Sequence, residues 1–325
     1  MPVSESMPRL CLGAPFCYTG RKFQGSRVMK NVPVILLVVL CLVVGFTPAQ
    51  AAHYEIKQME EGVYAAIALP EGKAASNAMI VVTPYQVILA GAHFIPEGIR
   101  ELIDAIAEIT PIPLRYVILT HHHPGYNHVD FDFPANVEII TSWQTWQSLR
   151  GESRQLRNHV TFFDKGLTLI RGKTVLVLNS TEFGHREGDI IIYLPNEGVL
   201  FTSDLFYNDV VGYMGEGKMR DWVVTLESLE AVGAKHVLPG LGDVSDRAGL
   251  RRFRLFFKEF LTEVLRHIEA GRSLPETKAQ FRLPRYDAMP GFRTFFDVNV
   301  ERAYLDLKED LEAAATSTQS RTPAR

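Results

Sequence analysis

Three consecutive histidines, His121 to His123, directly follow a short apolar run and could bind a metal ion. The run Tyr116 to Leu119 has the composition of a strand that is buried on both faces, and it ends at Thr120. Side chains alternate along an extended chain, so His121 and His123 are expected to point the same way. Neutral imidazole is a standard zinc ligand, although histidines at a strand end can also belong to a solvated loop. The pattern favours metal binding over the loop.

Three further segments place chemically useful residues just beyond an apolar strand. His185 follows Phe183-Gly184, Asp204 follows the run Val199 to Thr202, and Pro239-Gly240-Leu241-Gly242 follows a third strand. Proteins of the α/β class collect their active-site loops at such strand ends. Three histidines around a metal with one open position make a hydrolytic zinc site. The segments therefore strengthen the prediction of a metal centre.

In their order and spacing, the four segments resemble the motifs of the metallo-β-lactamase superfamily. That family's motifs read T-H-x-H-x-D-H, G-H-x-x-G-D, F-x-G-D and P-G-H-G, and the resemblance covers nearly all of residues 52–325. It implies a four-layer αββα sandwich of the α/β class. It also implies that His121, His123 and His185 hold one metal ion, with zinc expected and iron as the alternative. Asp204 matches the aspartate that bridges to a second metal.

The ligands of that second metal are largely missing from the motif positions. The motif aspartate falls on Gly125, the following histidine on Tyr126, and the histidine of P-G-H-G on Leu241. Glycine and leucine cannot bind a metal, and a neutral phenol is a poor zinc ligand. Ser203 replaces the glycine before the motif aspartate. The resemblance therefore implies a degenerate second metal site.

With that aspartate lost, another group would have to position the attacking water. The candidates for a catalytic role are His128 and Tyr126, and a two-residue slip of the loop would bring His128 to the usual position of the motif histidine. A capping or surface role for His128 is an equally simple alternative. The other candidates near the motifs are His93, His122 and Asp130. We interpret His93 as a loop residue, and Asp189 as a turn or capping residue.

Hydrophobic periodicity predicts alternating strands and helices. Strands are expected at residues 62–69, 78–83, 86–90, 116–119, 137–141, 174–178, 189–194, 199–202 and 236–238, and helices at residues 96–109, from about 221, 247–270 and 299–314. The pattern by itself indicates an α/β protein with mixed sheets. We expect one domain over residues 52–315 and a flexible polar tail over residues 316–325.

Residues 1–51 have the features of an upstream extension and a secretory signal peptide. Met29 is the natural start, Lys30 is followed by the apolar run 32–46, and Ala49-Gln50-Ala51 is a cleavage site of the A-x-A type. An uncleaved anchor is the alternative, but the run is shorter than the ~20 residues of a membrane span. We therefore predict a periplasmic or secreted protein with no stable membrane association after cleavage. All three cysteines lie in this segment, so the mature chain has no disulfide.

Composition limits the classes of partner. The formal net charge is −3, and no basic patch, P-loop or dinucleotide-binding glycine motif occurs. This excludes nucleic acid as the expected partner and leaves a small-molecule substrate. The sequence predicts an exported metal-dependent hydrolase that uses a metal-bound hydroxide on an ester, thioester, lactone or similar substrate. The alternative is a decayed family member that binds a metal or small ligand without turnover.

Overall fold

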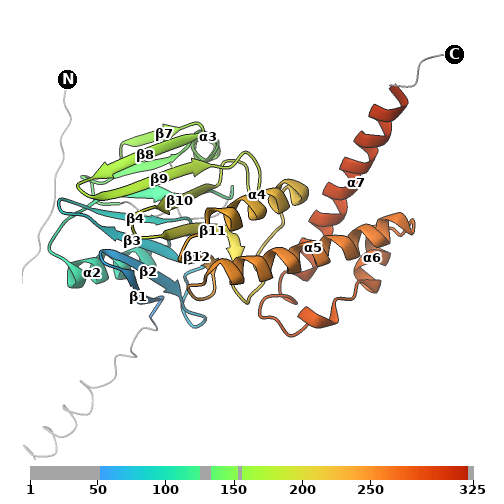
Figure 1. Ribbon diagram of the computed structural model, residues 1–325, viewed down its shortest axis with the longest axis horizontal. Coiled ribbons are helices and arrows are strands. Elements are labelled where there is room, and N and C mark those ends of the chain that lie inside the picture. Colours follow the sequence, from blue (N-terminus) through green and yellow to red (C-terminus); the bar gives the residue numbers. More distant parts are fainter. Residues whose placement is uncertain (1–51, 125–132, 153–155, 321–325) are drawn as a thin grey trace, which may run out of the picture. The chain divides into compact units, whose positions relative to one another are not determined.

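The computed structural model describes residues 52–124, 133–152 and 156–320, and the side chains of residues 315–320 are not described. Its strands form two sheets (Figure 1). The first sheet has the order β1-β2-β3-β4-β5-β6-β7 and the second the order β12-β11-β10-β9-β8. The strands are β1 (Tyr54–Glu60), β2 (Val63–Ala68), β3 (Ala78–Val82), β4 (Val87–Gly91), β5 (Leu114–Leu119), β6 (Glu138–Ser142), β7 (Val160–Phe163), β8 (Gly166–Arg171), β9 (Thr174–Ser180), β10 (Ile190–Leu194), β11 (Val199–Tyr207) and β12 (His236–Leu241).

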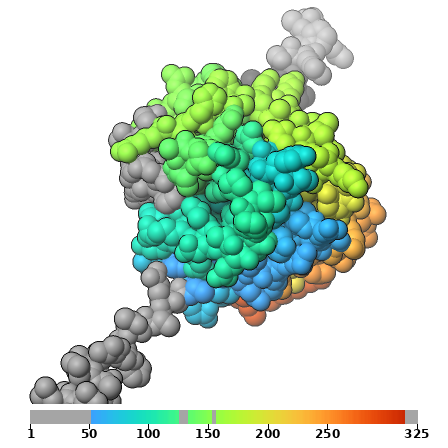
Figure 2. Space-filling view, turned by 90° about the vertical axis from the view of Figure 1, so that its left-hand side faces the viewer, coloured from blue at the N-terminus to red at the C-terminus, as the bar shows by residue number. Residues whose placement is uncertain are grey.

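Helices cover the outer face of each sheet. They are α2 (Pro96–Ile109), α3 (Trp143–Arg150), α4 (Met219–Val232), α5 (Arg247–Glu269), α6 (Leu274–Gln280) and α7 (Phe296–Ser320), with a 3-10 turn, η2 (Pro284–Tyr286). α2 and α3 pack on the first sheet, whereas α4 and α5 pack on the second. In Figure 2, blue, green and yellow-green residues, up to about residue 200, form the face, and the orange C-terminal elements appear only at its rim. The predicted αββα arrangement is confirmed.

The apolar strands of the first sheet are buried on both faces because they separate two cores. In β3, Met79 and Val81 point between the two sheets, whereas Ala78 and Ile80 point towards α2. The neighbouring strands β4 and β5 alternate in the same way. This explains why the run before His121 is wholly apolar.

The directions of the strands bring the motif loops to one edge. The strands β4, β5, β6 and β7 are parallel to one another, and β11 is parallel to β12. Loops that follow parallel neighbouring strands emerge at the same edge of a sheet. The strands expected at residues 189–194 and 199–202 are present as β10 and β11, which form an antiparallel hairpin.

The C-terminal helices differ from the expected pattern in two respects. The pattern missed α6, and α4 begins at Met219 with Lys218 at its N-cap, so Asp221 lies within the first turn. The amide of Met219 donates instead to the buried carboxylate of Asp306 on α7, at 2.8 Å. A distant helix thus satisfies a helix start that the local sequence does not cap.

An ion-pair cluster joins α4 to α5. Glu230 of α4 accepts hydrogen bonds from Arg251 at 2.7 Å and from Arg254 at 3.0 Å. Burial alone would raise the pKa of Glu230, but the two guanidinium groups outweigh this effect and hold the pKa below its ordinary value. Within the described part of the chain, no helix is both long and apolar enough to cross a membrane.

Candidate metal centre

The histidine segment leaves β5 in an extended conformation, so its side chains alternate. His121 and His123 point into the site, and both are buried, with 1% and 8% exposed surface. His122 points the other way, and its Nε2 lies 2.9 Å from Oε1 of Glu152. The sequence thus predicted correctly that the first and third histidines of the triplet share one side.

His185 and Asp204 reach the same place from the second sheet. His185 lies in the loop between β9 and β10, and Asp204 lies within β11. The imidazole of His185 is fully buried against the ring of Trp222, with the ring centres 5.4 Å apart. The four residues predicted as metal ligands are therefore brought together by two sheets and three separate chain segments.

The donor atoms of these residues converge. Oδ2 of Asp204 lies 3.7 Å from Nε2 of His121 and 4.0 Å from Nε2 of His185. Nε2 of His123 lies 2.8 Å from Nε2 of His185. Ligands of one zinc ion, bound at about 2.0–2.1 Å each, lie roughly 3–4 Å apart. The spacing is that of a metal-binding cluster.

The opposite ring nitrogens are held by groups that fix the tautomers. Nδ1 of His123 lies 3.1 Å from Oε2 of Glu216, a carboxylate that can only accept while it is ionised. The Tyr207 hydroxyl donates its only proton to the carbonyl of Tyr213 at 2.9 Å, so it can accept from Nδ1 of His185 at 3.4 Å. Both histidines then carry their proton on Nδ1 and a lone pair on Nε2. Such partners are typical of metal-bound histidines.

This arrangement fits a bound cation. Burial lowers the pKa of His123 and of His185 to about 3, so both rings are neutral at pH 7. Two lone pairs 2.8 Å apart repel each other unless a positive charge lies near both. A metal ion supplies that charge, and neutral imidazole is the form that binds it.

The carboxylate of Asp204 is fixed from its other side. The Ser76 hydroxyl donates to Oδ1 at 2.9 Å, which leaves Oδ2 facing the histidines. A Cβ atom at Gly240 would lie only 2.1 Å from the same Oδ1, so glycine is required there by close approach. The glycine of the P-G-x-G segment thus has a packing role beside the candidate ligand Asp204.

Ser203, which precedes Asp204, occupies a position that the family motif gives to glycine. Its φ is +48°, in the left-handed region where a side chain is strained. Its hydroxyl lies 2.8 Å from the Thr120 hydroxyl, next to the histidine segment. Ser203 therefore adopts a backbone conformation that favours glycine, and its hydroxyl adds a contact between the two sheets.

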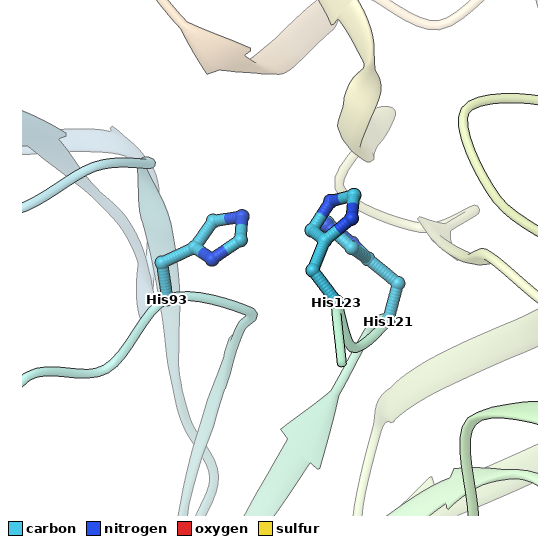
Figure 3. Close-up of side chains that lie close together, drawn as sticks. All are labelled: His93, His121 and His123. Atoms are coloured by element: carbon cyan, nitrogen blue, oxygen red, sulfur yellow. The ribbon is translucent and has the colours of Figure 1, made fainter. Parts of the chain in front are cut away.

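His93 lies in the loop between β4 and α2, as expected, but it also faces the ligand cluster. It is 6% exposed, and its Nε2 lies 3.3 Å from Oδ2 of Asp204. Figure 3 shows its ring pointing across the site towards His121 and His123. The described residues thus offer two groups of three possible ligands, His93-His121-His123 and His121-His185-Asp204, with the donor atoms of each group within 4.8 Å of one another. The expectation of a degenerate second metal site is therefore corrected, because two groups of possible ligands are present.

Asp189 has a turn role, as expected, and also lies at the site. Its Oδ2 accepts a hydrogen bond from the Arg186 amide at 2.7 Å, and its Oδ1 lies 4.0 Å from Nδ1 of His121. Burial raises the pKa of Asp189 well above its ordinary value. The other catalytic candidates, Tyr126 and His128, lie outside the described residues, as do Gly125 and Asp130.

A cavity of about 330 Å³ opens over the metal cluster. Its polar wall is formed by cluster residues and Glu216. The remaining lining residues are apolar or aromatic: Ala75, Pro124, Tyr207, Tyr213, Leu241 and Phe295. Leu241 stands where the motif has a histidine, so a lost ligand has become part of the apolar wall.

The C-terminal helix α7 holds the loop that carries Tyr213 and Glu216. Asn299 accepts from the Met214 amide at 2.7 Å and donates to the Gly212 carbonyl at 2.9 Å. One turn further, Arg302 donates to the Gly217 carbonyl at 2.7 Å. These contacts join residues more than 80 positions apart, and no local pattern in the sequence indicated them.

Comparisons with known proteins agree with the fold and the motifs. The model of the metallo-β-lactamase superfamily matches residues 76–240. The Bacteroides fragilis protein "Metallo-beta-lactamase type 2" is 22% identical over 198 residues, which cover 58% of this chain and 79% of that protein.

Solved structures show the same fold. A metallo-β-lactamase from Pontibacter korlensis has a TM-score of 0.55 and 21% identity, covering 63% of this chain and 99% of its own. The metallo-β-lactamase DIM-1 has a TM-score of 0.55 and 17% identity, covering 65% of this chain and 99% of its own. The family match ends at Gly240, so α5, α6 and α7 lie beyond it. On the fold, the converging ligands and a match over half of its length, the chain belongs to the metallo-β-lactamase superfamily.

Proposed function

We propose that this protein is a metal-dependent hydrolase that acts outside the cytoplasm on a neutral ester, thioester or lactone. The observation that carries the proposal is the convergence of His121, His123, His185 and Asp204, of which all but His121 line a largely apolar cavity. These four residues would hold a zinc ion. A zinc ion in such a site polarises a carbonyl and lowers the pKa of water to about 7.

The chain's own residues orient the site. Glu216 and Tyr207 keep the protons of two histidines on Nδ1, which directs both Nε2 lone pairs into the cavity. Hydrogen bonds hold the pKa of Asp204 below its ordinary value, even though burial alone would raise it. Before a metal binds, the larger contribution comes from His93, whose Nε2 lies 3.3 Å from Oδ2 of Asp204. An ionised carboxylate at the cavity floor can accept a proton from water.

The cavity walls support a neutral substrate. Among the described residues that line the cavity, the charged or ionisable side chains are histidines, aspartate, glutamate and tyrosine, with no lysine or arginine. Anionic groups are usually recognised by arginine or lysine. The apolar wall formed by Leu241 and Phe295 suits an acyl group of modest size.

The export step rests on the sequence. The basic start at Lys30, the apolar run 32–46 and Ala49-Gln50-Ala51 support cleavage after residue 51. N-terminal sequencing of protein recovered from culture fractions tests it, and an intact N-terminus on a membrane-bound chain would refute it.

A metal assay followed by a hydrolysis panel tests the activity. The protein is purified without a histidine tag, its metal is measured, and neutral aryl esters, thioesters, lactones and a chromogenic cephalosporin are offered with and without chelator. His185→Ala should lose most of the metal and at least about 100-fold in activity, more than the ~10–100-fold of an outer-shell change. His159→Ala is the matched control, because its side chain is 80% exposed.

Each outcome separates the alternatives. Hydrolysis of the neutral substrates that chelator abolishes supports the proposal. Preference for the cephalosporin would place the substrate among the β-lactams. Metal-loaded protein that hydrolyses none of them would favour a binding protein without turnover.

A further inference from the structure

His93 and His121 occupy equivalent positions on two neighbouring strands. β4 and β5 are parallel, and Gly91 pairs with Leu119 at their ends. His93 and His121 each lie two residues beyond this pair, and their ring centres are 5.1 Å apart. The parallel register of β4 and β5 therefore places the imidazole of His93 beside that of His121, as a fourth imidazole at the site.

The loop that carries His93 is anchored in the core. The next residue, Phe94, is 1% exposed and packs edge to face on Phe133, with the ring centres 6.0 Å apart. Pro96 then begins α2. With Phe94 fixed on one side, the ring of His93 lies in the site, stacked 5.6 Å from the ring of His123 (Figure 3). An imidazole held in this way loses little further freedom when it binds a ligand.

We propose that His93 is a fifth ligand of a single metal ion, together with His121, His123, His185 and Asp204. The proposal rests on the proposed function, since it takes the metal centre as its starting point. His93 would supply a donor that the motif positions of Tyr126 and Leu241 no longer provide.

The distances around Asp204 are compatible with one shared ion. Measured from Oδ2 of Asp204, Nε2 lies 3.3 Å away in His93, 3.7 Å in His121 and 4.0 Å in His185. Ligands on opposite sides of one ion lie about 4.2 Å apart at bond lengths of ~2.1 Å. The two candidate groups also share His121, and its Nε2 lone pair can bind only one metal.

The competing role for His93 is that of a hydrogen-bond donor to Asp204. Loss of such an outer-shell partner can itself weaken metal binding by ~10–100-fold, so affinity alone does not separate the two roles. The number of metal ligands separates the two roles. His93→Gln keeps an N–H donor for Asp204 but removes the imidazole.

The test uses the full chain loaded with Co²⁺ or Zn²⁺. The visible absorption bands of bound Co²⁺ become weaker as ligands are added, so loss of one ligand strengthens them. We expect one equivalent of metal in the wild type and stronger Co²⁺ bands in His93→Gln. Ser76→Ala is the matched control, because it removes an outer-shell hydrogen bond from the same carboxylate and should leave the bands unchanged.

X-ray absorption of the zinc-loaded wild type gives a second measurement that needs no variant. Scattering from four imidazoles supports the proposal, and scattering from three overturns it. Unchanged Co²⁺ bands in His93→Gln, or two equivalents of metal in the wild type, would also overturn it while leaving the hydrolase proposal intact. If the folded wild type binds neither metal, the metal-dependent function itself fails.

Discussion

Asn299→Ala tests whether α7 stabilises the fold and positions the loop that contacts His123. Asn299 is 1% exposed, and its side-chain amide makes two hydrogen bonds to the loop that carries Tyr213 and Glu216. Alanine removes both partners at once. The Met214 amide and the Gly212 carbonyl would then be buried without those hydrogen bonds.

The magnitude follows from these two groups. A buried backbone group left unsatisfied costs about 1–3 kcal/mol. Two such groups give a loss of about 2–5 kcal/mol in the free energy of unfolding, allowing for partial relaxation of the loop. Since single domains have ~5–15 kcal/mol in total, the variant should still fold but with a clearly lower midpoint.

The effect should also reach the metal. Glu216 lies on the same loop and holds Nδ1 of His123 at 3.1 Å. A loosened loop should weaken zinc binding by roughly 10-fold, the lower end for an outer-shell partner. Stability is measured by denaturant unfolding of the chelated protein, and zinc affinity by competition with a chromogenic chelator.

Asn196→Ala is the control, because Asn196 makes a single exposed hydrogen bond to the Lys173 carbonyl in a surface turn. It should change the free energy of unfolding by less than about 0.5 kcal/mol. If Asn299→Ala unfolds as late as this control, the buried hydrogen bonds are not formed. If it is destabilised but binds zinc unchanged, α7 supports the fold without positioning His123.

Three further changes test the surroundings of the site and the packing of its helices. Gly240→Ala should weaken zinc binding and destabilise the fold by about 1–3 kcal/mol, because the new methyl would meet Oδ1 of Asp204; unchanged zinc affinity would contradict the close approach. Ser203→Gly and Ser203→Ala both lose the hydrogen bond to Thr120. Only alanine keeps the strain of the left-handed backbone, so Ser203→Gly should be more stable than Ser203→Ala by about 1 kcal/mol in urea unfolding. The opposite order, usual within a strand, would argue against the strained backbone. Glu230→Gln should lower stability by about 1–3 kcal/mol at pH 7, because the folded pKa lies below the unfolded one and the ionised form is the stabilised form. The difference from wild type should shrink as the pH falls below about 4.5 through the folded pKa, and a difference independent of pH would refute the ion-pair origin.

Local patterns in the sequence identified candidate ligands that lie at strand ends. Alternation along an extended chain was enough to place His121 and His123 together and to turn His122 away. The segments around His185 and Asp204 each lie at a strand end, and the resemblance of the ordered segments to the family motifs implied the fold and the four candidate ligands. This information is local because a strand and the loop after it are adjacent in the sequence.

The tertiary structure decided the contacts that depend on which strands and helices are neighbours. His93 joins the site only because β4 pairs in parallel register with β5, and nothing around His93 encodes that pairing. Likewise, Glu216 reaches the cavity because Asn299 and Arg302 on α7 hold its loop from more than 80 residues away. Phe295, directly before α7, lines the same cavity. Side-chain periodicity reports which face of an element is buried, but not what lies against that face. The motif ligands could therefore be predicted from the sequence, whereas the fourth histidine and the walls of the cavity could not.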